Sequence, residues 1–200
     1  EVMALDLSSL KSVTAFTKSF LATYNQLDVL LNNAGIMTTP YGLTKDGLEQ
    51  QIGVNHFGHY ALTGQLFDVI KKTPGARIVN ISSLSHRDGV MDFDNLLFEG
   101  GKEYSPMKAY GQSKLANLLF TYELQRKIDK HGLDIKVLAA HPGISNTNLT
   151  RHIEVNWWFK LLKPLFVLMT QSSYNGALPG IRASSKALSL SSKSRCPRLA

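Results

Sequence analysis

The chain alternates short runs of apolar residues with longer segments in which apolar residues recur every three or four positions. The short runs predict buried strands at Val2–Leu5, Asp28–Leu31, Arg77–Ile81 and Ile135–Ala140. The longer segments predict helices over about 10–24, after Thr44, and over 106–131. Because strands alternate with helices, the sequence predicts an α/β fold in which helices cover a parallel sheet.

Two of the predicted helices carry a recognisable stripe. The helix after Thr44 has the helical spacing at Leu48, Ile52, Asn55, His59, Leu62 and Leu66. The helix over 106–131 is expected to pack through Leu115, Leu118, Leu119 and Tyr122. Ahead of this second helix, residues 84–105 have neither pattern and form an irregular insert.

Polar residues and glycines follow each predicted strand. They are Asp6, Asn33–Gly35, Ser83 and Pro142–Gly143. The carboxyl ends of parallel strands meet at one edge of a sheet, and ligands bind at that edge. Each group also has an ordinary explanation, which is a helix cap for Asp6 and Ser83 and a turn for the two glycine segments.

The pair Tyr110-x-x-x-Lys114 is the strongest chemical signal in the chain. Positions four apart on a helix share a face, so the Lys114 ammonium is expected beneath the Tyr110 ring. A cation there lowers the phenol pKa from its usual value of about 10, which makes Tyr110 a candidate general acid/base. Alone the pair is weak, because any amphipathic helix can carry it. Asn55, mid-helix, is either a satisfied core amide or a further catalytic group.

Composition narrows the functional classes. Five of the 22 basic residues and none of the 15 acidic ones lie after residue 181, so the net charge of +7 belongs mostly to the C-terminal end. The remainder is close to neutral, which argues against a nucleic-acid groove. The single cysteine, Cys196, fits a reducing, cytoplasmic compartment. No run of about 18 apolar residues predicts a membrane span, and no metal site is predicted.

The chain resembles the short-chain dehydrogenase/reductase family over about residues 1–185. The motifs occur in the family's order: NNAG at 32–35, Asn55, ISS at 81–83, YGQSK at 110–114, and HPG at 141–143 followed by Thr147. The resemblance implies a Rossmann fold, a doubly wound parallel sheet, that binds NADP or NAD, with NADP slightly favoured. Residues 186–200 lie beyond this catalytic domain and are expected to form a basic, disordered tail.

The same resemblance assigns roles to single residues. It implies that Tyr110 is the acid/base, that Lys114 lowers its pKa and holds the nicotinamide ribose, and that Ser83 orients the substrate carbonyl. Asn55 corresponds to the residue that keeps a proton-relay water in place. Cofactor contacts are implied for Asp6 and Leu7 at the adenine, for Asn33, Ala34 and Gly35, and for Pro142, Gly143 and Thr147 near the nicotinamide.

The insert between Ser83 and Tyr110, which are 27 positions apart, resembles the retinol-dehydrogenase-like branch of the family. That branch implies apolar alcohols, aldehydes or ketones as substrates. The apolar segment 155–169 is then either a core-facing helix interrupted by Pro164 or a lid over the substrate. As a lid it also gives the cytoplasmic protein a peripheral contact with a membrane surface.

The 200 residues contain no glycine-rich T-G-x-x-x-G-x-G loop, which cradles the cofactor pyrophosphate in the family. In the family's strand order, 3-2-1-4-5-6-7, two strands absent from this sequence separate Val2–Leu5 from Asp28–Leu31. We therefore expect an incomplete Rossmann fold that lacks the first βαβ unit, with Val2–Leu5 unpaired or paired non-natively. A fragment of this kind is expected to be inactive alone.

Two functions are consistent with this pattern. The favoured one is an NAD(P)-dependent oxidoreductase that moves a hydride between the nicotinamide and an apolar alcohol, aldehyde or ketone. The alternative is a non-catalytic regulatory protein that binds a dinucleotide on the same fold. Such regulators usually lose the catalytic Tyr or Lys, whereas Asn55, Ser83, Tyr110 and Lys114 are all present here.

Overall fold

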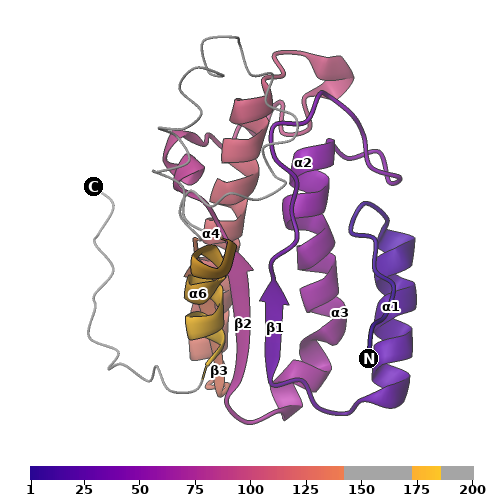
Figure 1. Ribbon diagram of the computed structural model, residues 1–200, viewed down its shortest axis with the longest axis vertical. Helices are drawn as coiled ribbons and strands as arrows, with labels where there is room; N and C mark the ends of the chain where they lie inside the picture. The colour runs from indigo at the N-terminus through magenta and orange to yellow at the C-terminus, as the bar shows by residue number, and fades with distance from the viewer. Residues whose placement is uncertain (142–172, 186–200) are drawn as a thin grey trace.

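Strands β1 (Val29–Asn32), β2 (Ala76–Ile81) and β3 (Ile135–Ala140) form a parallel sheet in that order. Figure 1 shows the computed structural model, which describes residues 1–141 and 173–185. The register places Leu31 opposite Val79 and Val79 opposite Leu138. The predicted strands at 28–31, 77–81 and 135–140 are confirmed to within one residue, and so is the prediction of a parallel sheet.

Helices and short turns connect the strands. The helices are α1 (Leu10–Thr23), α2 (Gln50–Ile52), α3 (Gly58–Lys72), α4 (Pro106–Lys130) and α6 (Ser173–Ser184). A π-helical turn, η1 (Gly53–Phe57), joins α2 to α3, and two 3-10 turns, η2 (Leu84–Asp88) and η3 (Glu99–Gly101), lie in the insert. The side chain of Ser9, three residues after Asp6, caps α1 by accepting the Ser12 N–H at 3.3 Å.

The helices lie on both faces of the sheet. On one face α3 and α4 cover the strands, and α1 packs on α3 (Figure 1). The core between these layers is apolar; it consists of Val13, Leu62, Leu66, Val69, Ile70, Ala76, Ile78, Ile128, Ile135 and Val137. On the other face α6 contacts all three strands, and a Cβ on Gly180 would lie 3.6 Å from Ile81.

The carboxyl ends of the strands and the first turns of α4 lie at the same edge of the sheet. In Figure 1 the arrowheads of β1 and β2 point toward the upper half of the molecule, where α2 and the N-terminal half of α4 lie. Tyr110 and Lys114 belong to that half of α4. The topology therefore brings the predicted polar residues together, as expected for a parallel α/β sheet.

The segment Val2–Leu5 is not a buried strand, so this prediction from its apolar composition is wrong. The segment forms no strand, Val2 is fully exposed, and Leu5 is 37% exposed. An apolar run becomes a strand only where a neighbouring strand satisfies its backbone groups. The expectation that Val2–Leu5 would be unpaired is confirmed.

The helix expected directly after Thr44 begins only at Gln50. The Thr44 hydroxyl accepts the N–H groups of Asp46 and Leu48, which makes residues 44–48 a turn. The buried carboxylate of Glu49 then accepts the N–H groups of Gln51 and Ile52 and so caps the helix. These local side-chain bonds compete with helical bonding and delay the start of the helix.

The predicted apolar stripe of α4 is also wrong in part. Leu119 and Tyr122 are 45% and 55% exposed. Apart from Tyr110 and Ile128, the buried residues are small or polar, namely Ala109, Gly111, Gln112, Ser113, Lys114, Ala116, Asn117 and Thr121. Small residues let α4 approach η2 closely, and the polar residues bond to β2 and η1, so most of this face does without large apolar side chains.

Some predictions fall on other parts of the chain. Pro142, Gly143, Thr147, the segment 155–169 and the tail 186–200 lie outside the described residues. Within residues 1–141 and 173–185, no helix combines the length and the apolar character that crossing a membrane requires.

Candidate active site

Tyr110 is the centre of the candidate site. It lies on the first turns of α4 and is 6% exposed. Its hydroxyl faces Ser83, which follows the end of β2, and this contact lowers the phenol pKa. On the other side, the Nζ atom of Lys114 lies over the Tyr110 ring at 5.5 Å from its centroid. The structure thus brings together the three residues that the motif spacing singled out.

The two serines after β2 have different partners. The hydroxyl of Ser82 donates to the Lys114 carbonyl at 2.9 Å and is buried. Ser83 caps η2 by accepting the Ser85 N–H at 3.3 Å, and its hydroxyl is the one that reaches Tyr110. Ser82 therefore fastens α4 to the end of β2, whereas Ser83 faces the phenol.

Asn55 lies in the π-helical turn η1 and is fully buried. Its side-chain oxygen accepts the Ile36 N–H at 2.8 Å, and its side-chain nitrogen donates to the Ile36 carbonyl at 2.9 Å. The same nitrogen donates to the Ser113 hydroxyl at 2.9 Å, and that hydroxyl donates to the Tyr110 carbonyl at 2.8 Å. Asn55 is thus a satisfied core amide that ties the loop after β1 to the helix of Tyr110. Single-turn π-helices are frequent at functional sites.

The pKa of Tyr110 is raised above its usual value, contrary to the expected effect of Lys114. Burial is the main cause, and the contact with Ser83 opposes the rise. Lys114 is buried as well, which lowers its own pKa to about 8. Its ammonium donates to the Ile81 carbonyl at 3.2 Å and lies over the ring rather than at the phenol oxygen. The positive charge is therefore directed at a backbone carbonyl, and desolvation dominates at Tyr110.

The loop after β1 presents backbone rather than side chains to this site. A Cβ on Gly35 would lie 3.0 Å from the Asn55 Oδ1 atom and 3.5 Å from the Lys114 Nζ atom. Asn33 and Ala34, beside it, are exposed. A bare backbone next to an ammonium and a phenol suits the hydroxyl groups of a nicotinamide ribose, since Lys114 donates and Tyr110 can donate or accept. Tyr110, Lys114 and Asn33–Gly35 therefore fit the nicotinamide end of NAD(P).

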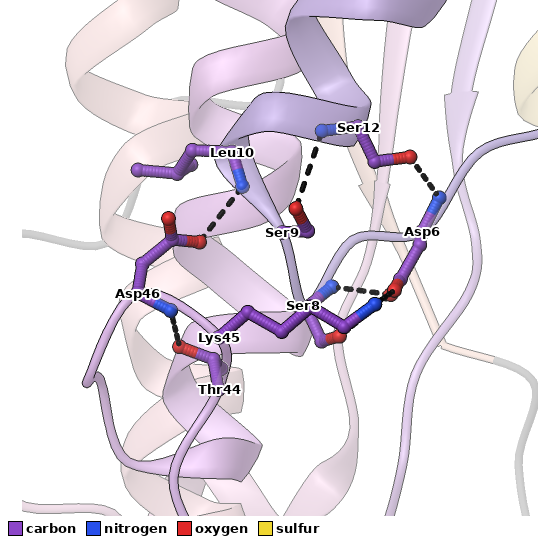
Figure 2. Close-up of polar contacts among 8 residues, drawn as sticks. All are labelled: Asp6, Ser8, Ser9, Leu10, Ser12, Thr44, Lys45 and Asp46. Atoms are coloured by element: carbon purple, nitrogen blue, oxygen red, sulfur yellow. Dashed lines mark hydrogen bonds and ion pairs between the residues drawn. The ribbon is translucent and has the colours of Figure 1, made fainter.

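Figure 2 shows how Asp6 is held. Its carboxylate forms an ion pair with Lys45 at 2.7 Å and accepts the N–H and the hydroxyl of Ser8 at 2.9 and 2.7 Å. These bonds lower the Asp6 pKa to about 2, and the bond from Lys45 has the largest effect. In the same view Asp46 accepts the N–H of Leu10 at 2.7 Å, at the start of α1. Asp6 thus joins the entry to α1 with the turn that precedes α2.

Leu7, the second predicted adenine contact, packs against the apolar core. A Cβ on Gly58 would lie 2.6 Å from the Leu7 carbonyl oxygen, so α3 begins in direct contact with the Leu7 backbone. The roles of Asp6 and Leu7 at an adenine stay predictions, because the contacts described involve only the protein.

Comparison with known proteins bears on the identity of this fold and site. Residues 1–95 match the family model for short chain dehydrogenase. Over 183 residues the chain is 44% identical to retinol dehydrogenase 14 of Homo sapiens, and the match covers 92% of this chain and 52% of that protein. The chain belongs to the short-chain dehydrogenase/reductase family. Its relatives place it in the retinol-dehydrogenase-like branch of that family, and it spans about half the length of the curated relatives it matches.

Solved structures agree with the short-chain dehydrogenase/reductase fold. An uncharacterized protein from Mycobacterium paratuberculosis is 48% identical, with a TM-score of 0.66 over 76% of this chain and 53% of that one. The 3-oxoacyl-[acyl-carrier protein] reductase from Brucella melitensis, solved in complex with NAD, shares the fold at 22% identity, with a TM-score of 0.64 over 92% of this chain and 70% of that one. The predicted α/β class with a parallel, Rossmann-type sheet is therefore confirmed.

Several residues of this candidate site could not be singled out from the sequence. Ser113 links Asn55 to Tyr110, and Gly111 allows η2 to lie directly on α4. His59 places its Nδ1 atom 3.1 Å from the Asn55 carbonyl. Ser113 and Gly111 lie inside the Tyr110–Lys114 interval, so their position was the available signal. His59 was recognised only as part of a helical stripe.

Proposed function

We propose that this chain forms the catalytic half of an NAD(P)-dependent oxidoreductase that interconverts a small apolar alcohol with its aldehyde or ketone. The observation that carries the proposal is the position of Tyr110 between Ser83 and Lys114. Two hydroxyl groups that face each other at a sheet edge are suited to share a carbonyl oxygen, because each can donate to it. The relatives named retinol dehydrogenase support an apolar substrate.

In the proposed reaction, bound NAD(P) supplies or accepts the hydride. Tyr110 donates its phenolic proton to the substrate oxygen during carbonyl reduction and recovers a proton during alcohol oxidation. Because burial raises the Tyr110 pKa, the phenol is protonated at neutral pH and can donate its proton. Ser83 donates to the same substrate oxygen and orients it.

Lys114 and Asn55 support this chemistry by holding the ribose and the surrounding backbone in place. Lys114 would hold the nicotinamide ribose, with Gly35 leaving room for the sugar. Asn55 fixes the position of that loop through both backbone groups of Ile36 and, through Ser113, the backbone of Tyr110. We propose that Asn55 acts by holding these two elements at a fixed separation.

Further residue roles are proposed from the resemblance to the short-chain dehydrogenase/reductase family. Asp6 and Leu7 would lie near the adenine, and Pro142, Gly143 and Thr147 near the nicotinamide. The segment 155–169 would cover an apolar substrate and touch a membrane surface, in a protein that otherwise resides in the cytoplasm. Residues 1–185 would form the dinucleotide-binding and catalytic domain, followed by the basic tail 186–200. NADP or NAD both fit the ribose site.

We also propose that these 200 residues alone bind NAD(P) weakly and do not turn over substrate. They contain no glycine-rich loop for the pyrophosphate, and the ribose site by itself provides only part of the binding free energy. Titration of the 200-residue chain with NADPH and with NADH, followed by calorimetry, tests this. Micromolar affinity for either dinucleotide would contradict it.

The catalytic proposal is tested with a chimera in which the segment of human retinol dehydrogenase 14 that precedes its match to this chain is joined to Glu1. We expect the chimera to reduce apolar aldehydes with NADPH or NADH. Replacing Tyr110 by phenylalanine should lower kcat by about two to four orders of magnitude, because proton transfer is lost while dinucleotide affinity is retained.

The matched control is Tyr122→Phe. Tyr122 lies on the same helix and is 55% exposed, so removing its hydroxyl should leave kcat unchanged. Wild-type turnover by Tyr110→Phe would remove Tyr110 from its proposed role. A chimera that binds the dinucleotide and reduces no apolar carbonyl would instead favour the regulatory alternative.

A further inference from the structure

His59 contacts the backbone of Asn55. It lies on the first turn of α3, one turn after Asn55, and is 4% exposed. Its Nδ1 atom is 3.1 Å from the Asn55 carbonyl oxygen. A carbonyl oxygen can only accept, so Nδ1 must carry the hydrogen, and a neutral His59 is the Nδ1–H tautomer.

This bond is made at the irregular part of the helix. In η1 the Gly58 N–H bonds to the Gly53 carbonyl five residues earlier, as in a π-helix, rather than four residues earlier. A side chain that inserts into the backbone hydrogen-bond ladder is a recognised cause of such irregularity. His59 therefore supplies a side-chain donor where the helical register changes, directly at the backbone of Asn55.

The electrostatic surroundings keep this imidazole neutral. Lys114 on α4 and His56 in η1 both lie near His59, and both disfavour a positive charge on its ring. Burial is the largest effect, and together these lower the His59 pKa to about 4. At neutral pH the ring therefore has one N–H, and that N–H is committed to Asn55.

We infer that His59 is a positioning residue for the proposed active site, which holds the Asn55 carbonyl through its Nδ1–H and so fixes the turn that aims the Asn55 amide. That amide bonds to both backbone groups of Ile36, the residue after Gly35. Gly35 in turn lies close to Lys114. The same amide donates to the Ser113 hydroxyl, which donates to the Tyr110 carbonyl. The description of these groups as an active site rests on the proposed function, whereas the contact itself does not.

The first test is the tautomer of His59 in the 200-residue chain labelled with 15N-histidine. Long-range 1H–15N NMR spectra distinguish Nδ1–H from Nε2–H rings. We expect His59 to be the Nδ1–H tautomer and to keep its shifts unchanged from about pH 8 down to about pH 5, because its pKa lies lower. An Nε2–H ring would overturn the inference.

The second test separates the hydrogen bond from simple packing. His59→Asn places an amide N–H near the position of Nδ1 and retains the donor, whereas His59→Leu keeps the bulk and removes it. Amide exchange of Ile36 and the titration of Lys114, both followed by NMR, are the readouts. We expect His59→Leu to accelerate Ile36 exchange by about tenfold and to move the Lys114 titration, and His59→Asn to restore both.

The control is His56→Leu. His56 lies three residues before His59, and its side chain bonds to Asn117 rather than to Asn55. This variant should leave Ile36 exchange unchanged. Equal effects of His59→Leu and His59→Asn would show that His59 only fills space. If His59→Leu does not fold, the tautomer in the unaltered chain still decides. A wrong tautomer refutes this inference and leaves the proposed function intact, while an inactive chimera refutes the function and leaves the His59–Asn55 bond intact.

Discussion

Gly111 lies against the backbone of Ser85, and a Cβ on Gly111 would be only 2.9 Å from the Ser85 carbonyl oxygen. The approach is mutual, because a Cβ on Gly89 would lie 2.5 Å from the Gly111 carbonyl oxygen. These two glycines let η2 rest directly on α4. Since Ser83 is the N-cap of η2, the same approach brings Ser83 to Tyr110.

Gly111→Ala should therefore separate Ser83 from Tyr110. The added methyl group has no space unless η2 moves, because the opposing atoms are backbone rather than a flexible side chain. We expect a loss of about 1–3 kcal/mol in the free energy of unfolding, measured by urea denaturation, since overpacking costs this much. In the chimera, kcat for an aldehyde should fall more than KM changes.

Gly64→Ala is the matched control for a glycine replaced within a helix. Gly64 lies in α3, is exposed, and a Cβ there meets nothing within 4 Å. Alanine should stabilise the protein by about 0.5–1 kcal/mol through helix propensity. Destabilisation by both variants to the same extent would show that the contact between η2 and α4 is not the cause.

Lys114→Met should stabilise the fold at neutral pH while it removes the ribose contact. Burial lowers the Lys114 pKa from 10.5 to about 8, so below pH 8 the folded protein carries a penalised charge. Methionine has a similar volume and no charge, and we expect a gain of about 1–3 kcal/mol in the free energy of unfolding at pH 7.

The pH dependence of this gain follows from the sign of the shift. The folded pKa of Lys114 lies below its unfolded value, so the unaltered protein recovers stability as pH rises from about 8 to 10.5. The advantage of Lys114→Met should shrink over that interval, as measured by thermal unfolding at each pH. A constant difference across it would contradict the explanation by charge burial.

We predict that protonation of His59 makes the protein lose stability in mild acid. Its folded pKa of about 4 lies below the usual 6.5, so the folded state resists protonation and stability is lost as pH falls from 6.5 to about 4. The loss from this group is on the order of 3 kcal/mol. Glu49, whose pKa burial raises, has the opposite sign, so the informative quantity is the difference between the unaltered chain and His59→Asn.

Chemical unfolding of both proteins between pH 7 and pH 4 makes this comparison. We expect the unfolding free energy of the unaltered chain to decline more steeply than that of His59→Asn. Parallel curves would mean that His59 is not the group that titrates.

The sequence was sufficient to predict the sheet and the central residues of the site. Strand positions followed from short apolar runs, and the residues that end them had to meet at one edge because parallel strands share their direction. Tyr110 and Lys114 share a helical face, so their contact is a local consequence of spacing. These predictions depend on geometry within one element or on a topological rule.

Other features could not be predicted because they depend on contacts that a pattern does not contain. Val2–Leu5 has the composition of a strand, but strand formation needs a partner elsewhere in the chain. Much of the buried face of α4 is polar because β2 and η1 offer hydrogen-bond partners, as when Asn80 donates to Thr121 at 2.9 Å and Asn55 donates to Ser113 at 2.9 Å. The π-helical turn at Asn55 likewise depends on its surroundings, and helical spacing cannot distinguish it from a regular turn.

Gly35 provides a last prediction, which separates local geometry from global stability. Its φ is not in the left-handed region, so alanine is not strained by the backbone, but the new Cβ would lie 3.0 Å from the Asn55 Oδ1 atom. Gly35→Ala should therefore cost less than about 1 kcal/mol in unfolding free energy, yet loosen the bonds between Asn55 and Ile36. Faster Ile36 amide exchange and a shifted Lys114 titration are the expected NMR results. Ala34→Val, at the exposed neighbouring position, should change neither. If Gly35→Ala also leaves both unchanged, the bare backbone at Gly35 is not what keeps the loop close to Asn55 and Lys114.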